Sequence, residues 1–87
     1  MELLRFGNAE PDVMTSLRKK YRLTPTQARV ATLLADRLTN AEIALELRVR
    51  PSTARRHTEA VLFRLGVDSR FKVVTTLADL FDEASRS

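Results

Sequence analysis

Four arginines lie close together in the second half of the chain, in a stretch without acidic residues. They are Arg48, Arg50, Arg55 and Arg56. A guanidinium group suits nucleic-acid phosphates and also the acceptor edge of guanine in the DNA major groove. The net charge of +4 and the pI near 10.3 likewise favour a polyanionic partner. The charge therefore predicts nucleic-acid binding, although many small basic proteins bind none.

The 87 residues lack the groups that an enzyme or a metal site would need. The chain has one histidine, His57, no cysteine, and two glycines that form no phosphate-binding loop. No carboxylate is placed to activate His57 as a base, so we expect it to be structural or to contact phosphate. A metal site is not expected with so few candidate ligands. We predict a binding protein that is not an enzyme and uses no cofactor.

The arginines lie in and just after a tight break between two expected helices. The first is expected over Asn40–Leu47, and residues 49–51 interrupt its pattern. Pro51 suits the first position of a second helix, which is expected to run to about Leu65, before Gly66. Two helices joined by so short a break are typical of a helix-turn-helix, whose second helix can lie in the major groove.

The second helix has an apolar and a polar side. The apolar stripe, expected to face the core, contains Ala54, Thr58, Val61, Leu62 and Leu65. The opposite side carries Ser52, Arg55, Arg56, Glu59 and Phe63. A solvated surface helix would show the same segregation. The position of the arginines, at the start of a second helix after a short turn, favours contact with DNA.

Three further helices are expected to support this unit, at residues 11–21, 25–37 and 70–83. Capping-box patterns, in which a threonine and the side chain three residues later satisfy backbone N–H groups, mark two helix starts. These patterns are Thr24 with Gln27 and Thr39 with Glu42. No strand-like alternation is present. We predict an all-α fold: a four-helix domain over residues 23–84, with an additional short N-terminal helix in an arm of residues 1–22 that the sequence does not place.

The last helix has two apolar stripes, and one of them can complete the core. One stripe is Phe71, Val74, Ala78 and Phe81; the other includes Val73, Leu77 and Leu80. Exposed apolar patches usually mark interfaces, so the uncovered stripe predicts a second copy of the chain. We predict a homodimer through Val73, Leu77 and Leu80. The alternative is that the first helix and the N-terminal arm bury both stripes.

Several linked motifs resemble the LuxR-type (GerE-type) helix-turn-helix domain of bacterial transcription regulators. The resemblance covers residues 23–80, and the order and spacing of the motifs make it specific. The motifs are Leu23-Thr24-Pro25, Leu33-Leu34-Ala35, TNAEIA at residues 39–44, PSTARRH at residues 51–57 and LGVDSR at residues 65–70. Sigma-factor regions share the helix-turn-helix but usually lack the histidine and the Leu-Gly-Val segment. The resemblance implies a four-helix domain that binds duplex DNA, commonly as a dimer through its last helix.

The resemblance also implies roles for single residues. Thr53 and Arg55 match the family's threonine and lysine, which touch the backbone and the groove; Thr53 could also cap its helix. Arg56 and Glu59 stand at positions that family members use to read bases. Asn40 matches an asparagine near the DNA backbone. The predicted DNA-binding set is Asn40, Arg50, Ser52, Thr53, Arg55, Arg56, His57 and Glu59.

Four residues depart from the family's pattern. Arg37 replaces a glycine that usually ends a helix, so that turn could differ. Arg50 replaces a Ser or Thr that usually caps the helix. The replacement removes a side-chain cap that typically contributes about 1 kcal/mol to stability, and it offers a phosphate contact instead. Thr58 stands at an aliphatic core position, where its hydroxyl can bond back to the preceding turn. Glu59 could accept from a cytosine amino group or could weaken binding.

We predict a sequence-specific duplex-DNA-binding transcription regulator of the bacterial cytoplasm and nucleoid, with the helix from about Pro51 to Leu65 in the major groove. The alternative is an interaction module of the same fold that binds another regulator or RNA polymerase. The longest apolar run, residues 30–35, is far too short to cross a membrane. A sensor domain would not fit ahead of Leu23, which leaves a stand-alone regulator or an excised output domain.

Overall fold

The computed structural model describes residues 6–85, with the side chains of residues 6–83, and this part of the chain is helical without strands. A single 3-10 turn, η1 (Phe6–Asn8), precedes the α-helices. These are α1 (Pro11–Tyr21), α2 (Pro25–Ala35), α3 (Asn40–Leu47), α4 (Pro51–Leu65) and α5 (Arg70–Ser85). The predicted all-α fold is confirmed.

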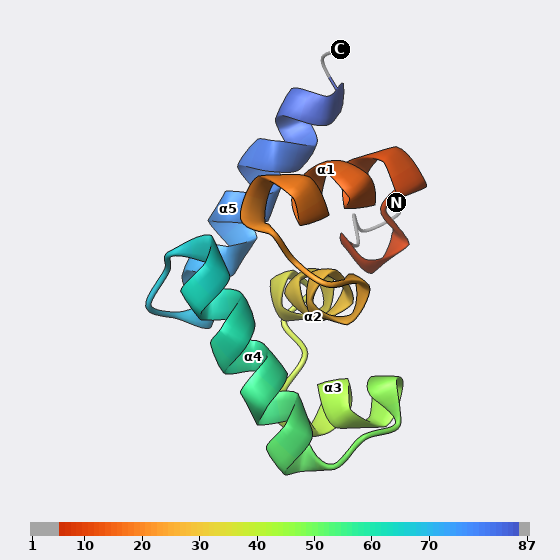
Figure 1. The fold of residues 1–87 in the computed structure, drawn as a ribbon, viewed down its shortest axis with the longest axis vertical. Helices are drawn as coiled ribbons and strands as arrows, with labels where there is room; N and C mark the ends of the chain where they lie inside the picture. The colour runs from red at the N-terminus through yellow and green to blue at the C-terminus, as the bar shows by residue number, and fades with distance from the viewer. Residues whose placement is uncertain (1–5, 86–87) are drawn as a thin grey trace.

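Helix α2 lies at the centre of the fold, and α4 and α5 both pack against it (Figure 1). Seven of its eleven residues are buried, as its broad apolar face predicts: Ala28, Val30, Ala31, Thr32, Leu33, Leu34 and Ala35. Helix α3 packs on α4, and α1 packs on α2 and α5. The molecule measures 38 × 31 × 21 Å, and α1 lies towards the opposite end of its longest axis from α3 and the start of α4.

The stripe of α5 that was predicted to form a dimer is part of the chain's own core. Val73 and Leu77 are fully buried, and Leu80 is 6 % exposed. The assignment of these three side chains to a dimer surface is therefore wrong, because they have almost no exposed surface left for a second chain. The other stripe is only partly covered: Phe71 is 79 % exposed and Phe81 is half-buried, so the alternative of two buried stripes does not hold either.

The N-terminal arm is attached to the domain by the turn η1. The backbone N–H groups of Phe6 and Gly7 donate to the two carboxylate oxygens of Asp36, at 2.7 and 2.9 Å. The Phe6 ring meets Phe81 of α5 edge to face, with ring centroids 5.0 Å apart. Residues 1–5 of the predicted arm lie outside the described residues. The arm therefore joins the end of α2 to α5, so the alternative in which the arm covers the outer stripe holds at Phe81 but not at the exposed Phe71.

Both predicted capping boxes are present. The Thr24 hydroxyl accepts from the N–H of Gln27, the Thr39 hydroxyl accepts from that of Glu42, and each partner side chain accepts in return from the threonine N–H. The helix over residues 25–37 ends two residues early, at Ala35. Arg37 then adopts the left-handed conformation, with φ of 69°, so the turn keeps a backbone suited to the glycine that the family usually has there.

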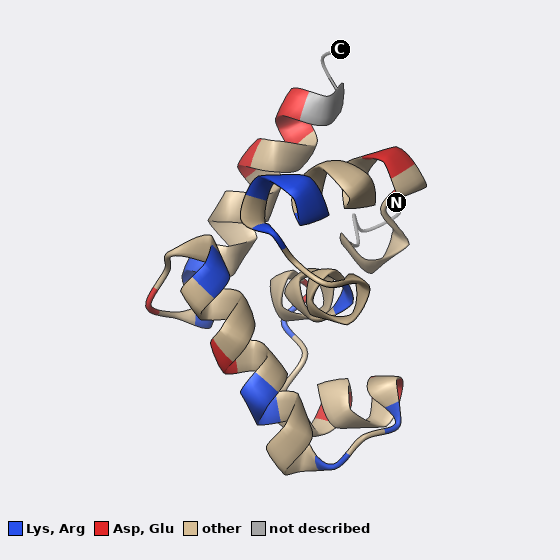
Figure 2. Cartoon of the chain, in the orientation of Figure 1, with Lys and Arg blue, Asp and Glu red and all other residues tan. Residues whose placement is uncertain are grey.

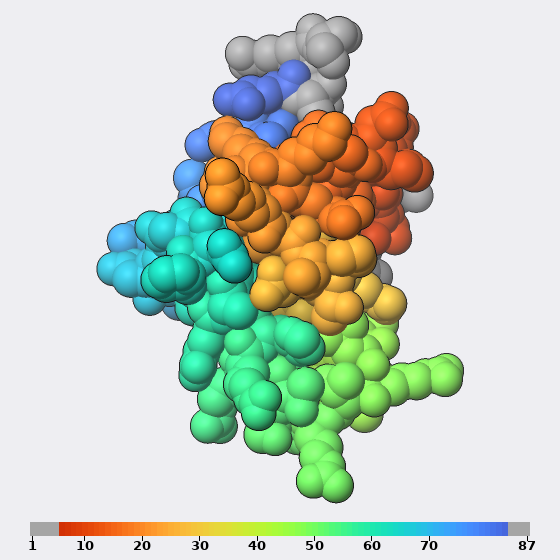
Figure 3. Space-filling view, viewed as in Figure 1, coloured from red at the N-terminus to blue at the C-terminus, as the bar shows by residue number. Residues whose placement is uncertain are grey.

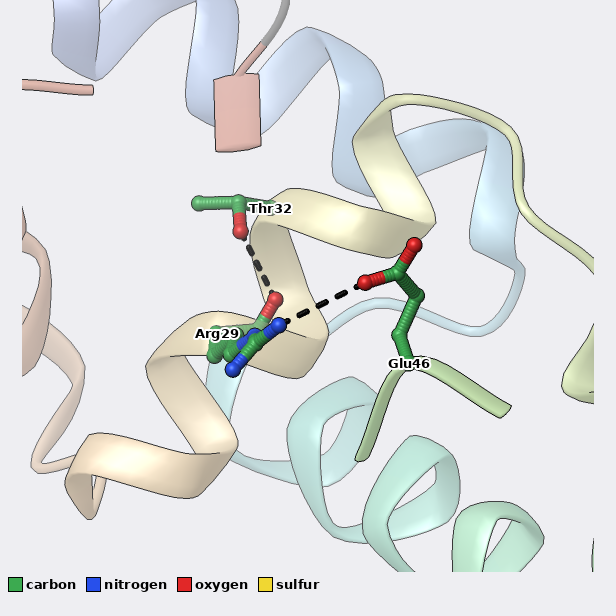
Figure 4. A network of polar contacts seen from close by, with 3 residues as sticks. All are labelled: Arg29, Thr32 and Glu46. Atoms are coloured by element: carbon green, nitrogen blue, oxygen red, sulfur yellow. Dashed lines mark hydrogen bonds and ion pairs between the residues drawn. The ribbon is translucent and has the colours of Figure 1, made fainter. Parts of the chain in front are cut away.

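An ion pair connects α2 and α3 on the surface (Figure 4). Arg29 Nη2 lies 3.4 Å from a carboxylate oxygen of Glu46, and both side chains are about half exposed. A pair this exposed contributes at most about 1 kcal/mol. The Thr32 hydroxyl, which is buried, donates to the carbonyl of Arg29 at 2.7 Å. The position of α3 therefore depends mainly on its packing against α4 and on the burial of Ile43 and Ala44.

Candidate nucleic-acid interface

A short turn connects α3 to α4. Arg48 ends α3 in the left-handed conformation, with φ of 58°, and Val49 N–H donates to the carbonyl of Ala44 at 3.0 Å. Arg50 is extended, and Pro51 begins α4 as predicted. Arg50 makes no side-chain cap, so its exposed guanidinium is available to a ligand. Side chains near this turn reach well away from the body of the molecule (Figure 3).

Helix α4 is held by one buried side and presents the other to solvent. Ala54 and Val61 are fully buried, and Thr58 and Leu65 nearly so, whereas Leu62 of the predicted stripe is only half-buried. The exposed residues of α4 are Pro51, Ser52, Arg55, Arg56, Glu59, Phe63 and Arg64. The structure therefore places four of the predicted DNA-binding residues together on the surface.

The arginines on this surface are not neutralised within the chain. Among residues 6–83, Arg50, Arg55 and Arg56 form no hydrogen bond or ion pair through their side chains. Arg55 and Glu59 are four residues apart, a spacing that permits a helical ion pair, yet they do not pair. Both the guanidinium groups and the Glu59 carboxylate are thus open to an external partner.

Thr53 and His57 lie on one flank of α4 and are half-buried. Thr53 does not cap the helix, because Arg50 is the N-cap residue and no side chain caps that end. His57 lines a surface hollow between the start of α2 and the α3–α4 turn. The hollow is also lined by Pro25, Thr26, Arg29, Glu46, Leu47, Arg48 and Val49. His57 therefore lies beside the exposed arginines and faces a different direction.

Asn40, the first residue of α3, is held by two other helices. Its Oδ1 accepts from Arg70 Nη2 of α5 at 3.2 Å and from the Thr58 hydroxyl of α4 at 3.2 Å. The same hydroxyl also reaches the carbonyl of Ala54 at 3.0 Å, which confirms the predicted back-bond of Thr58. Sequence reasoning missed Arg70 as a residue of this region. It belongs to a motif of the resemblance, but a contact across 30 residues leaves no local pattern.

Charge is unevenly distributed along the molecule (Figure 2). Basic residues occupy the α3–α4 turn and the first turns of α4, and a second basic cluster lies at the end of α1; Asp79, Asp82 and Glu83 lie near the end of α5. Two carboxylates have shifted pKa values. The N–H and hydroxyl of Thr39 lower the pKa of Glu42, and a hydrogen bond from Lys72 lowers the pKa of Asp68. Both carboxylates already accept hydrogen bonds within the chain, so neither is available as a catalytic acid or base.

The described residues contain no cluster of three or more potential metal-ligating side chains. None of the helices described is long and apolar enough to cross a membrane.

Two helices joined by a tight turn, the second of them basic and exposed, define a helix-turn-helix of the DNA-binding class. The model of the family "Bacterial regulatory proteins, luxR family" matches residues 21–77. The chain belongs to this family, which confirms the resemblance inferred from its motifs. Nearly all of α1 lies outside the match.

A relative supports this assignment. The chain is 39 % identical over 64 residues to the Mycobacterium tuberculosis (strain ATCC 25618 / H37Rv) protein named "Putative HTH-type transcriptional regulator Rv0890c". The match covers 74 % of this chain and 6 % of that protein, so the likeness concerns one small domain of a much longer regulator. No solved structure matches the chain significantly.

Proposed function

We propose that this domain binds duplex DNA sequence-specifically and regulates transcription in the bacterial cytoplasm, with α4 inserted in the major groove. The observation that carries the proposal is the pair of exposed arginines, Arg55 and Arg56, which lack acidic partners near the start of α4. The buried residues Ala54 and Thr58 hold that part of the helix against the core. A rigid helix with basic N-terminal side chains is the element that reaches base edges in this class. Neither an enzymatic activity nor a cofactor is part of the proposal.

The interface divides into residues that position the domain and residues that read bases. Arg50 and Ser52, at and just after the turn, suit contacts to phosphates on the rim of the groove, as does Thr53. Arg56 and Glu59 lie deeper along the exposed side of α4. Arginine suits the acceptor edge of guanine, and a carboxylate accepts from the amino group of cytosine. His57, on the flank, would contact the DNA backbone.

We also propose that the domain dimerises through α5, but through a different side of this helix from the one predicted from the sequence. Since Val73, Leu77 and Leu80 are buried, only the outer side of α5 is left for a second copy, and it carries the exposed ring of Phe71. Sedimentation at high micromolar concentration should show a dimer that Phe71→Ser weakens. Monomer alone under these conditions would contradict dimer formation by this domain.

The test of DNA binding is a fluorescence-anisotropy titration of mixed-sequence duplex DNA across a salt series. The logarithm of the affinity should fall linearly with the logarithm of salt, by about 0.9 for each phosphate contacted. Arg55→Gln with Arg56→Gln should abolish measurable binding while circular dichroism shows a folded protein. Lys19→Gln is the matched control, since it removes one exposed charge from α1, towards the other end of the molecule. Unchanged binding in the double variant would refute the assignment.

A second candidate function is an interaction module that binds another regulator or RNA polymerase. It is favoured by the rings of Phe63 and Phe71, which are 82 % and 79 % exposed, because exposed aromatic rings are frequent at protein interfaces. A pulldown that resists nuclease and does not depend on Arg55 or Arg56 would support this function. Wild-type protein that fails to bind DNA even at low salt would do the same.

A further inference from the structure

We infer that Arg70 is a positioning residue for DNA binding: it orients the side-chain amide of Asn40 so that the Asn40 NH₂ group faces a DNA phosphate. The inference rests on the proposed DNA binding and extends it to a residue of α5. The observation behind it is the hydrogen bond from Arg70 Nη2 to Asn40 Oδ1, 3.2 Å long, which connects the first residue of α5 to the first residue of α3.

The chemistry of Arg70 determines which way the Asn40 amide is turned. A guanidinium can only donate hydrogen bonds, so the amide atom that faces it must be the oxygen. The Thr58 hydroxyl has a single proton, which it can donate to Asn40 Oδ1 at 3.2 Å or to the Ala54 carbonyl at 3.0 Å, so Arg70 is the donor that fixes the amide. With Oδ1 facing Arg70, the amide cannot exchange its oxygen and nitrogen positions without placing an N–H group of Asn40 against an N–H group of Arg70.

The NH₂ group of Asn40 is thereby left as a donor. Among the residues that the structure describes, Nδ2 has no hydrogen-bond partner, and the Asn40 side chain is only half-buried. The nearest acid in sequence, Glu42, is engaged elsewhere: its carboxylate accepts from the Thr39 N–H at 2.8 Å. A donor without a partner suits an acceptor such as a phosphate oxygen.

The network also locates this donor beside α4. Asn40 contacts Thr58, which follows Arg55 by three residues and therefore lies on a neighbouring strip of the helix. The amide of Asn40 thus borders the Arg55 flank, whereas His57 faces the hollow near α2. If α4 lies in a DNA groove, the two strands of the duplex border its two flanks. Asn40 would then face the phosphates of one strand, and His57 those of the other.

Asn40→Asp gives the sharpest test, because it separates the two edges of the amide. The aspartate keeps an oxygen for Arg70 and adds a charge that attracts it, but it loses the NH₂ donor. We expect an unchanged or higher Tm at neutral pH, together with a loss of DNA affinity of about tenfold or more, since a hydrogen bond to a charged group is lost. DNA affinity equal to that of the wild type would overturn the inference.

A double-mutant cycle distinguishes positioning from direct contact. Arg70→Ala should weaken DNA binding about tenfold in the wild-type background and less than twofold in the Asn40→Ala background. Its salt slope should stay unchanged, because Asn40 carries no charge; an Arg70 that neutralised a phosphate itself would lower the slope by about 0.9. Equal losses in both backgrounds, or a reduced slope, would overturn the inference. Arg70→Lys, which keeps a donor and the charge, should restore part of the affinity.

Two measurements without DNA separate this inference from the proposed function. The side-chain NH₂ resonances of Asn40 should shift in Arg70→Ala, and the thermal unfolding of each variant shows whether it is folded. If the wild type binds no DNA, the proposed function fails, and the Asn40 resonances still report whether Arg70 holds the amide. If the wild type binds DNA and these resonances do not respond to Arg70→Ala, the positioning role alone is wrong.

Discussion

Replacing Leu77 by alanine tests whether α5 stabilises the monomer through the stripe that sequence analysis assigned to a dimer. Leu77 is fully buried, and truncating a buried leucine costs about 2–5 kcal/mol through lost transfer energy and the cavity left behind. A domain of this size has roughly 4–13 kcal/mol of total stability, at about 0.05–0.15 kcal/mol per residue. Leu77→Ala should therefore remove a large part of it and lower Tm by about 10 °C or more.

The assay is urea unfolding, followed by circular dichroism at two protein concentrations differing about a hundredfold. Leu45→Ala is the matched control, since it makes the same truncation at a leucine of α3 that is 79 % exposed; its effect should stay within about 0.5 kcal/mol. A core role for Leu77 predicts a lower midpoint at both concentrations. An unfolding midpoint unchanged by Leu77→Ala, with a wild-type midpoint that rises with concentration, would refute the reasoning and restore Leu77 to a dimer surface.

Two further predictions concern helix ends. Arg37→Gly should stabilise the domain by about 0.5–1 kcal/mol in urea unfolding, because glycine adopts the left-handed backbone without strain; the greater entropy of its unfolded chain offsets part of this gain. Arg37→Ala, which keeps a Cβ, should change the stability little. A destabilising Arg37→Gly would mean that the arginine side chain itself contributes to stability. The lowered pKa of Glu42 means that its contribution is present above the ordinary value of 4.5 and is lost as pH falls through the folded-state value. Glu42→Gln should therefore make Tm fall less steeply below about pH 5. Some fall should remain, since Asp68 also has a lowered pKa. If Tm depends on pH as in the wild type, protonation of Glu42 does not contribute to acid unfolding.

The features that could be predicted from the sequence are those set by neighbouring residues. The capping boxes at Thr24 and Thr39 satisfy backbone groups within one turn, so a four-residue pattern is enough to locate each helix start. Pro51 and Gly66 mark the bounds of α4 for equally local reasons. The exposed side of α4 also follows from its 3.6-residue period, because a helix with one apolar stripe can bury only that stripe.

The features that could not be predicted depend on contacts between distant segments. Either stripe of α5 has the right period to face the core, and the choice depends on where α2 and η1 lie. The Asp36 carboxylate caps η1 and the Phe6 ring meets Phe81, yet each contact joins segments that are far apart in sequence. The turn at Arg37 likewise could not be predicted. The sequence shows that the usual glycine is absent, but only the structure shows that the arginine adopts the left-handed conformation.

The contact between Arg70 and Asn40 gives α5 a part in DNA binding that does not require it to touch DNA. Arg70 begins the helix whose buried stripe holds the core and whose outer side is proposed for a second copy. If a partner on the outer side moved the start of α5, the hydrogen bond to Asn40 Oδ1 would be strained or broken, and the orientation of the amide would change with it. Dimerisation and phosphate contact would then be energetically coupled, and such coupling is reciprocal. Phe71→Ser should therefore weaken DNA binding in the wild-type background by more than in Asn40→Ala, and equal losses in the two backgrounds would show that the two events are independent.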